Sequence, residues 1–269
     1  MRLVVKVGSS TLTHSTGMLN IRLVEKLCKV LSDIKNSGHD VVLVSSGAVA
    51  MGVGKLNLRE RPSDTQTKQA AAAVGQCELM YTYDKLFGEF NHNVAQILLT
   101  GNDISSANRE NIENTLNRLL ELGAMPIINE NDTVSTAELE ALNVLGDNDT
   151  LAAIVAVFVK ADMLVLLSDI DGMYTADPRT NPDAELIHRI PKLTEEIIQS
   201  AGGSGTSQGT GGMVTKLNAA KIACSKGIDM VIANGDRPEN LYDILDGKEV
   251  GTYFVGRKKR LEARRGNCN

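Results

Sequence analysis

Apolar residues occur along the chain in two alternating patterns. Short continuous runs are typical of buried β-strands, and longer stretches with apolar residues at every third or fourth position are typical of amphipathic helices. Strands are predicted at residues 3–7, 41–44, 94–99, 125–128, 163–167, 230–233 and 251–255, and helices at residues 21–37, 65–90, 107–122, 149–161 and 213–226. This alternation predicts an α/β fold, a three-layer α/β/α sandwich with a mostly parallel open sheet. In such a fold a ligand site is expected along the C-terminal ends of the strands.

Polar residues cluster at the ends of two neighbouring elements. The stretch Gly146-Asp147-Asn148-Asp149 stands directly before the apolar run 151–159, and its side-chain oxygens suit a helix N-terminus because they accept from unpaired backbone N–H groups. A similar burst, Ile127 to Asp132, ends the strand upstream. The pair of bursts favours a second interpretation, a site for a polar ligand. Both interpretations stay open on these residues alone.

Two further features suit phosphate groups. The run Gly209 to Lys216 combines sterically unrestricted glycines, exposed N–H groups, a helix beginning at about Met213 and a lysine one turn into that helix. Lys6 stands at the end of the first strand, next to a turn of small hydroxyl residues. A flexible surface loop and a solvated lysine are the plainer alternatives. The chain has neither the P-loop pattern, GxxxxGK followed by Ser or Thr, nor GxGxxG, which argues against P-loop and Rossmann sites.

Composition narrows the classes of function. With 269 residues, 42% hydrophobic and 23% charged, the chain is expected to form one ordinary globular domain. Trp is absent and aromatic residues make up 3%, so few side chains could stack on nucleobases. The four cysteines are scattered without a CxxC pair, which predicts neither a zinc site nor a disulfide framework. The first strand follows Met1 directly, without a signal segment, and the helix 149–161 is too short to cross a membrane, so a cytoplasmic protein is expected.

Charge is unevenly distributed. The formal net charge is −5, yet residues 256–269 carry six basic residues against one acidic residue. A solvated, poorly ordered terminus is the expected interpretation of this short basic tail, with the domain proper spanning residues 1–255. No nucleic-acid partner is expected, although binding through the tail stays an alternative.

Carboxylates complete the candidate chemistry. Asp132, Asp147, Asp149 and Asp169 could pair with the lysines, with a substrate ammonium group or with a nucleotide-bound Mg²⁺. The four histidines have no relation to the polar strand ends, so a mechanism driven by histidine is not expected. Transfer of a phosphoryl group onto a carboxylate needs no base, because a carboxyl group with a pKa of about 4 is already ionised at neutral pH.

The order and spacing of these motifs resemble the amino acid kinase family nearly from end to end. The stretches that carry the resemblance are residues 4–9, 44–48, 127–132, 146–149, 167–169, 174–179 and 209–216. The pair Asn-Glu-Asn-Asp and Gly-Asp-Asn-Asp is similar to the branch that acts on free L-glutamate, and differs from the branches that act on acetylglutamate, carbamate, aspartate and uridylate. The resemblance implies ATP-dependent phosphorylation of the γ-carboxylate of L-glutamate to L-glutamyl 5-phosphate, the first step of proline biosynthesis. It also implies ATP with Mg²⁺ carried by the nucleotide, and no metal site of the protein itself.

The resemblance assigns roles to individual residues. Lys6 and Lys216 would neutralise the transferring phosphoryl group, and Asp149 would hold both lysines in place. Ser46, Asp132 and Asn148 would bind glutamate. Asp147 is the best candidate for helix capping and loop structure, and whether Asp147 or Glu130 also contacts a ligand stays open. The ATP site would be lined by Lys6, Ser168, Asp169, Thr210, Gly211, Gly212, Met213, Val214, Thr215 and Lys216.

Further expectations follow from the same resemblance. Many family members in this branch are inhibited by proline, and the fold pairs through helices, so feedback inhibition and a homodimer or homotetramer are expected. The C-terminal domain of some bacterial relatives, which resembles RNA-modifying enzymes, is not expected here. Two alternatives stay open: a kinase for another carboxylic acid, and a non-catalytic amino-acid sensor. Asp132 favours a substrate with a free ammonium group, and both lysines with Asp149 favour retained chemistry.

Overall fold

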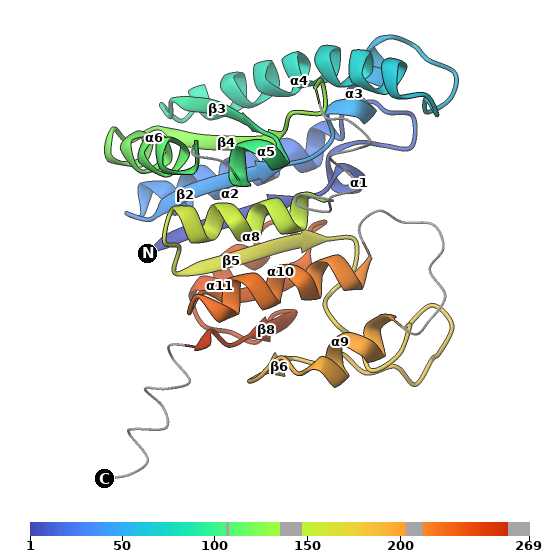
Figure 1. Cartoon of the computed structure of the whole chain (residues 1–269), viewed down its shortest axis with the longest axis vertical. Coiled ribbons are helices and arrows are strands. Elements are labelled where there is room, and N and C mark those ends of the chain that lie inside the picture. Colours follow the sequence, from blue (N-terminus) through green and yellow to red (C-terminus); the bar gives the residue numbers. More distant parts are fainter. Residues whose placement is uncertain (106–107, 135–146, 203–211, 258–269) are drawn as a thin grey trace. The chain divides into compact units, whose positions relative to one another are not determined.

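The computed structural model describes residues 1–105, 108–134, 147–202 and 212–257 (Figure 1). The chain divides into two compact units. Unit 1 comprises residues 1–6 and 149–269, and unit 2 comprises residues 7–148. The chain therefore passes from unit 1 to unit 2 after Lys6 and returns after Asn148.

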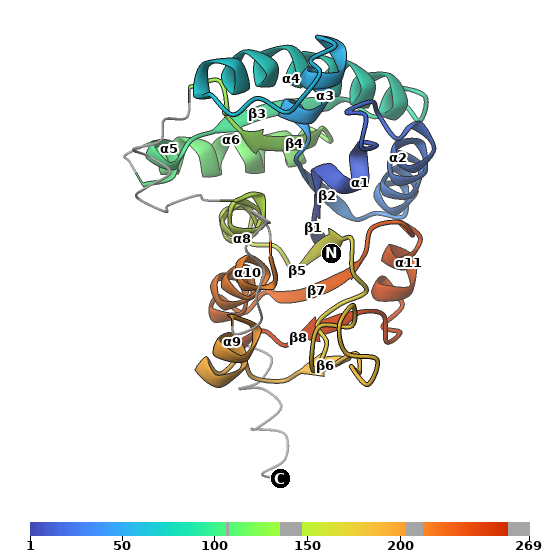
Figure 2. The same cartoon turned by 90° about the vertical axis from the view of Figure 1, so that its right-hand side faces the viewer.

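Unit 2 is built on three parallel strands in the order β3-β4-β2. Val44 of β2 lies opposite Ile128 of β4, so the residues that follow these two parallel strands emerge at the same edge. Helices cover both faces, with α2 and α6 on opposite sides of the strands (Figure 2). The elements of this unit are α1 (Ser9–Leu12), α2 (Ile21–Asn36), β2 (Asp40–Ser45), α3 (Ala48–Lys55), α4 (Thr65–Gly88), β3 (Val94–Leu99), α5 (Gly101–Ser105), α6 (Arg109–Glu121) and β4 (Met125–Glu130).

The two longest helices of unit 2 begin at side-chain caps. The Asn20 side chain accepts from the backbone N–H of Leu23 at 3.4 Å at the start of α2. The Asp64 side chain accepts from the N–H of Thr67 at 2.8 Å at the start of α4. Each cap satisfies an N–H group that has no partner within its helix, which explains why the helices start at these positions.

Helices α3 and α4 approach each other through glycines. A Cβ atom on Gly52 would lie 1.8 Å from the carbonyl oxygen of Ala71, and a Cβ atom on Gly75 would lie 1.8 Å from that of Ala48. Real Cβ atoms do not come so close to backbone, so both positions require glycine at this helix spacing. The contact fixes the position of α4, whose buried face carries two polar side chains, Gln76 and Tyr83.

Unit 1 has the strand order β1-β5-β7-β8-β6. Strands β5 and β7 are parallel, with Ser168 opposite Asn234, whereas β8 runs antiparallel to β7. Figure 2 shows α8 and α10 on one face of these strands and α11 on the other. The elements are β1 (Arg2–Val7), α8 (Asn148–Phe158), β5 (Met163–Ser168), β6 (Arg189–Ile190), α9 (Glu195–Gly202), α10 (Met213–Ser225), β7 (Asp229–Asn234), α11 (Asn240–Leu245) and β8 (Thr252–Phe254), the last residue of β1 and the first of α8 belonging to unit 2.

The predicted fold class is confirmed, because mostly parallel strands carry helices on both faces. Every strand and helix predicted from the apolar pattern is present, with bounds shifted by a few residues. The elements that were not predicted are all short: α1, α3, α5, α9, α11 and β6. The limit of the domain at residue 255 stays a prediction, and residues 258–269 of the basic tail lie outside the described residues. Among the helices described, none is both long and apolar enough to cross a membrane.

Candidate active site

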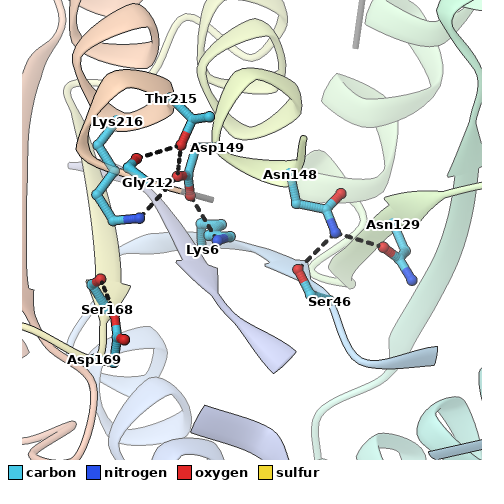
Figure 3. Close-up of polar contacts among 10 residues, drawn as sticks. All are labelled: Lys6, Ser46, Asn129, Asn148, Asp149, Ser168, Asp169, Gly212, Thr215 and Lys216. Carbon is cyan, nitrogen blue, oxygen red and sulfur yellow. Dashed lines mark hydrogen bonds and ion pairs between the residues drawn. The ribbon is translucent and has the colours of Figure 1, made fainter. Parts of the chain in front are cut away.

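A buried carboxylate lies between two lysines in unit 1 (Figure 3). The Oδ1 of Asp149 is 2.6 Å from the Nζ of Lys6, and its Oδ2 is 3.1 Å from the Nζ of Lys216. The hydroxyl of Thr215 lies 2.9 Å from the same Oδ2, within hydrogen-bond distance. We call these four residues the lysine cluster. The side chain of Asp149 is 1% exposed and those of Lys6 and Lys216 are 12% and 6% exposed, so the charges face one another largely outside water.

The lysine cluster is assembled from one strand end and two helix starts. Lys6 is the last residue but one of β1, in which Leu3, Val4, Val5 and Val7 are buried. Asp149 lies in the first turn of α8, where the helix dipole favours a negative charge. Thr215 and Lys216 lie in the first turn of α10. Because α8 and α10 are anchored by buried apolar side chains, the polar residues at their tips are held in fixed positions.

The charges of the cluster do not cancel. Burial by itself would raise the pKa of Asp149, but the positive charges of Lys6 and Lys216 and their hydrogen bonds outweigh burial and lower this pKa. Asp149 is therefore ionised at neutral pH. Two ammonium groups then face one carboxylate, and the positive charge in excess makes the cluster attractive to an anion.

Other residues predicted for the ATP site lie at the end of β5 and the start of α10. Ser168 is buried, and its hydroxyl donates to the carboxylate of Asp169 at 3.0 Å (Figure 3). Gly212 and Met213 are half-buried, and Val214 is exposed. Thr210 and Gly211, which belong to the same predicted run, lie outside the described residues.

A second polar cluster lies in unit 2. The Nδ2 of Asn148 donates to the Oγ of Ser46 at 2.7 Å and to the Oδ1 of Asn129 at 3.1 Å (Figure 3). The Nδ2 of Asn129 donates in turn to the Oε1 of Gln76 at 3.0 Å. We call these four residues the amide cluster. The Oδ1 of Asn148 is buried and has no hydrogen-bond partner among the residues described, so the cluster offers an acceptor to a ligand.

The amide cluster follows from the topology of unit 2. Ser46 comes directly after β2 and Asn129 is the last residue but one of the parallel neighbour β4, so both stand at the C-terminal ends of these strands. Gly47 turns the chain away after Ser46 with a φ of 103°, a conformation that favours glycine. Asp132 follows β4 and is half-buried.

Each cluster contains one of two residues that are adjacent in the sequence. Asn148 is the last residue of unit 2 and Asp149 the first residue of the returning segment of unit 1. One peptide bond therefore links Asn148 of the amide cluster to Asp149 of the lysine cluster.

The structure brings together several residues that the sequence singled out. Lys6, Asp149, Lys216 and Thr215 form one cluster, and Ser46 and Asn148 contact each other in the other. Their roles in binding and catalysis stay predictions.

Two members of the amide cluster were not selected from the sequence. Asn129 stands inside the polar burst that ends β4, where Asp132 drew the attention instead. Gln76 is a polar residue within a helical stretch of small apolar residues, at a position that the helical period places on the buried face. A buried amide needs hydrogen-bond partners, so a Gln on the buried face of a predicted helix indicates a polar contact there.

No resident metal site is evident in the described part of the chain. No group of three or more His, Cys, Asp and Glu side chains there is arranged to hold an ion. The donor set of the lysine cluster is mainly cationic, which suits phosphate oxygens rather than a metal ion bound by the protein.

Residues 1–234 match the amino acid kinase family, and the chain belongs to this family. A glutamate 5-kinase from Clostridium perfringens is 54% identical over 258 residues, covering 96% of both chains. A glutamate 5-kinase from Clostridium tetani is 54% identical over 253 residues, covering 94% of this chain and 93% of the relative. The resemblance to the family that the motifs indicated is thus confirmed.

The fold also resembles that of a solved structure. The UMP kinase of Bacillus anthracis superposes with a TM-score of 0.65 at 15% sequence identity, covering 95% of this chain and 96% of that one. At this identity the likeness extends to the fold alone.

Proposed function

We propose that this protein transfers the γ-phosphoryl group of ATP to the γ-carboxylate of L-glutamate, giving L-glutamyl 5-phosphate and ADP, as the first step of proline biosynthesis. Two relatives at 54% identity over nearly the whole chain carry the name glutamate 5-kinase, which supports this substrate pair. The kinase domain is proposed to span residues 1–255, and the reaction to take place in the cytoplasm.

The lysine cluster is the observation that carries the proposal. Lys6 and Lys216 converge on Asp149 at 2.6 and 3.1 Å, which leaves one positive charge in excess at a nearly water-free position. A phosphoryl group in transfer spreads negative charge over its oxygens, and fixed positive charges stabilise that state because they need no reorganisation. We assign both lysines to this stabilisation and Asp149 to holding them in place.

The acceptor needs orientation rather than activation. The γ-carboxylate is ionised at neutral pH, so one of its oxygens attacks the γ-phosphorus directly while the bond to the bridging oxygen of ADP breaks. No proton has to be removed from the nucleophile. Binding by Ser46, Asp132 and Asn148 would supply the orientation, with Asp132 as one partner, the charged one, of the α-ammonium group.

The nucleotide site is proposed along Ser168, Asp169 and residues 210–216, together with Lys6. Magnesium is proposed to be carried by the phosphates of ATP, where it neutralises charge. We further propose feedback inhibition by proline near the glutamate pocket and a homo-oligomeric assembly. Unchanged turnover at millimolar proline would refute the feedback inhibition, and a monomer in analytical ultracentrifugation would refute the homo-oligomeric assembly.

An assay with three carboxylic acids tests the main proposal. ADP release is measured with L-glutamate, N-acetyl-L-glutamate and L-aspartate, and hydroxylamine is added to trap the acyl phosphate as a hydroxamate. We expect L-glutamate to be the best substrate by far, because an acetylated amine would leave the negative charge of Asp132 without a cationic partner on the substrate. N-acetylglutamate or aspartate as the best substrate would contradict the proposal.

A further inference from the structure

Gln76 has a buried side-chain amide to which no role in the reaction has been assigned above. It lies on α4, is 9% exposed, and its Oε1 accepts from the Nδ2 of Asn129 at 3.0 Å. Buried amides in helices are costly unless their hydrogen bonds are made, so a Gln at this position has to be explained by what it holds.

The orientation of the Asn129 amide follows from its own backbone. The N–H of Glu130 donates to the Oδ1 of Asn129 at 2.9 Å. A backbone N–H can only donate, so the atom that it contacts must be the side-chain oxygen. The nitrogen of Asn129 therefore faces Gln76, and Oε1 of Gln76 is the acceptor that holds it there.

This orientation determines that of Asn148. Because the Oδ1 of Asn129 accepts, the atom of Asn148 that lies 3.1 Å from it must be the nitrogen. The same nitrogen lies 2.7 Å from the Oγ of Ser46, to which it donates. The oxygen of Asn148 is thus turned away from both partners, as Figure 3 shows, and stays buried without a hydrogen bond from the described residues.

The consequence is a defined pattern of one acceptor and one donor. The Oδ1 of Asn148 can only accept, so it suits an ammonium group. The hydroxyl of Ser46 accepts from Asn148 through its oxygen, so its own hydrogen is directed to another acceptor, such as a carboxylate oxygen. An α-amino acid carries both complementary groups.

We propose that Gln76 is a positioning residue that sets the specificity of the amide cluster for an α-amino acid, by holding Asn129 and through it Asn148 in the orientation that presents Asn148 Oδ1 to a substrate ammonium group. The inference rests on the proposed function, since it takes glutamate as the ligand of this cluster.

The helix that carries Gln76 is itself held in place. Its neighbour Gly75 packs against α3, where a Cβ atom would lie 1.8 Å from the carbonyl oxygen of Ala48. Tyr83, seven residues after Gln76 and thus on the same helix face, forms a hydrogen bond of 2.8 Å with Ser45. One face of α4 therefore contacts the ends of both β2 and β4, which carry Ser46 and Asn129.

Steady-state kinetics of Gln76→Met test the proposal. Methionine keeps the length of the side chain but removes the acceptor, so Asn129 loses one of the contacts that orient it. We expect KM for glutamate to rise roughly tenfold, the effect of one unsatisfied buried hydrogen bond, with KM for ATP and kcat close to wild type. Gln76→Glu keeps an acceptor oxygen and should restore KM for glutamate to within about threefold of wild type.

Matched controls separate this outcome from a loss of folding. Gln66→Met makes the same change at an exposed position of the same helix and should leave all constants unchanged. Thermal unfolding identifies variants that do not fold. If Gln76→Met does not fold, Gln76→Asn replaces it, because its shorter side chain withdraws the acceptor oxygen by one methylene group. We expect the same rise in KM for glutamate in Gln76→Asn.

A double-variant cycle tests the route through Asn148. In an Asn148→Ala background, Gln76→Met should change kcat/KM for glutamate by less than about twofold, because the amide that Gln76 orients is gone. Independent, multiplying effects would overturn the proposal, as would an unchanged KM for glutamate or equal changes in both KM values. A wild-type protein that does not phosphorylate glutamate would instead refute the proposed function, so the two failures are distinguishable.

Discussion

The ammonium group of Lys6 lies 2.6 Å from Oδ1 of Asp149, although the two residues are far apart in the sequence. The other oxygen of the same carboxylate is 3.1 Å from Nζ of Lys216. One buried carboxylate therefore pairs with two lysines that come from different elements. Removing one member of a buried ion pair is costly because the charge that remains has no partner. The cluster therefore responds to substitution as a unit.

Asp149→Asn should reduce both stability and turnover. The variant leaves two buried ammonium groups facing a neutral amide, so we expect the free energy of unfolding to fall by about 3–5 kcal/mol. Turnover should fall by roughly 10²–10³-fold, because the lysines lose the orientation that transition-state stabilisation requires. Urea unfolding and the glutamate-dependent release of ADP measure the two effects. Asp183→Asn, at an exposed position of the same unit, is the matched control, and an equal response to both substitutions would argue against the assigned role.

Lys216→Met should affect the chemical step more than substrate binding. The change removes one positive charge from the site of the transferring phosphoryl group, so kcat should fall by roughly 10²-fold or more while KM for glutamate changes little. Lys221→Met removes a lysine from the same helix, where Lys221 forms a solvent-exposed ion pair with Glu195 at 3.0 Å, and should be close to wild type. Phosphoryl transfer that survives the loss of Lys216 would refute the mechanism.

The stability contributed by Asp149 should depend on pH in one direction. Its pKa in the folded chain is below the ordinary value of 3.8, because the lysine charges outweigh burial. A group with a lowered folded-state pKa stabilises fully above its unfolded pKa and loses that contribution as pH falls through the folded value. The advantage of the wild type over Asp149→Asn should therefore shrink on acidification below the ordinary aspartate range. Urea unfolding of both proteins along a pH series measures it, and an advantage that grows in acid would contradict the assignment.

The long elements could be predicted because each has a clear apolar period. The strand β5 is buried at all six positions, and α2 repeats its buried residues at helical spacing, so neither needs tertiary information to be recognised. Short elements such as α1 (Ser9–Leu12) and α11 (Asn240–Leu245) have too few residues to show a period, and their helical form depends on their surroundings.

The lysine cluster could be predicted in part. Lys6, Asp149 and Lys216 stand at the ends of predicted strands and helices, where a charged residue can face a ligand. The family resemblance indicated that the three residues belong to one site. The amide cluster could not be predicted in full, because the contact between Gln76 and Asn129 joins residues far apart in sequence and requires the packing of α4 against β4's end. Amide orientations also depend on a backbone N–H that has no signature in the sequence.

The packing of α3 against α4 gives a test of this dependence on tertiary structure. Helix propensity alone would favour Gly75→Ala by about 1 kcal/mol. The new Cβ atom would lie 1.8 Å from the carbonyl oxygen of Ala48, so one helix must shift, and overpacking of this kind costs about 1–3 kcal/mol or more. We expect the steric cost to exceed the gain in helix propensity, so Gly75→Ala should unfold at a lower urea concentration than the wild type.

Gly88→Ala is the matched control for Gly75→Ala on the same helix. A Cβ atom at Gly88 meets no atom within 4 Å, so only the propensity term applies and the variant should be as stable as the wild type or more stable by up to about 1 kcal/mol. Because Gly75 precedes Gln76, a shift of α4 should also disturb the amide cluster, and KM for glutamate should rise in Gly75→Ala but not in Gly88→Ala. Equal stabilisation by both substitutions would mean that α3 and α4 are not packed through these glycines.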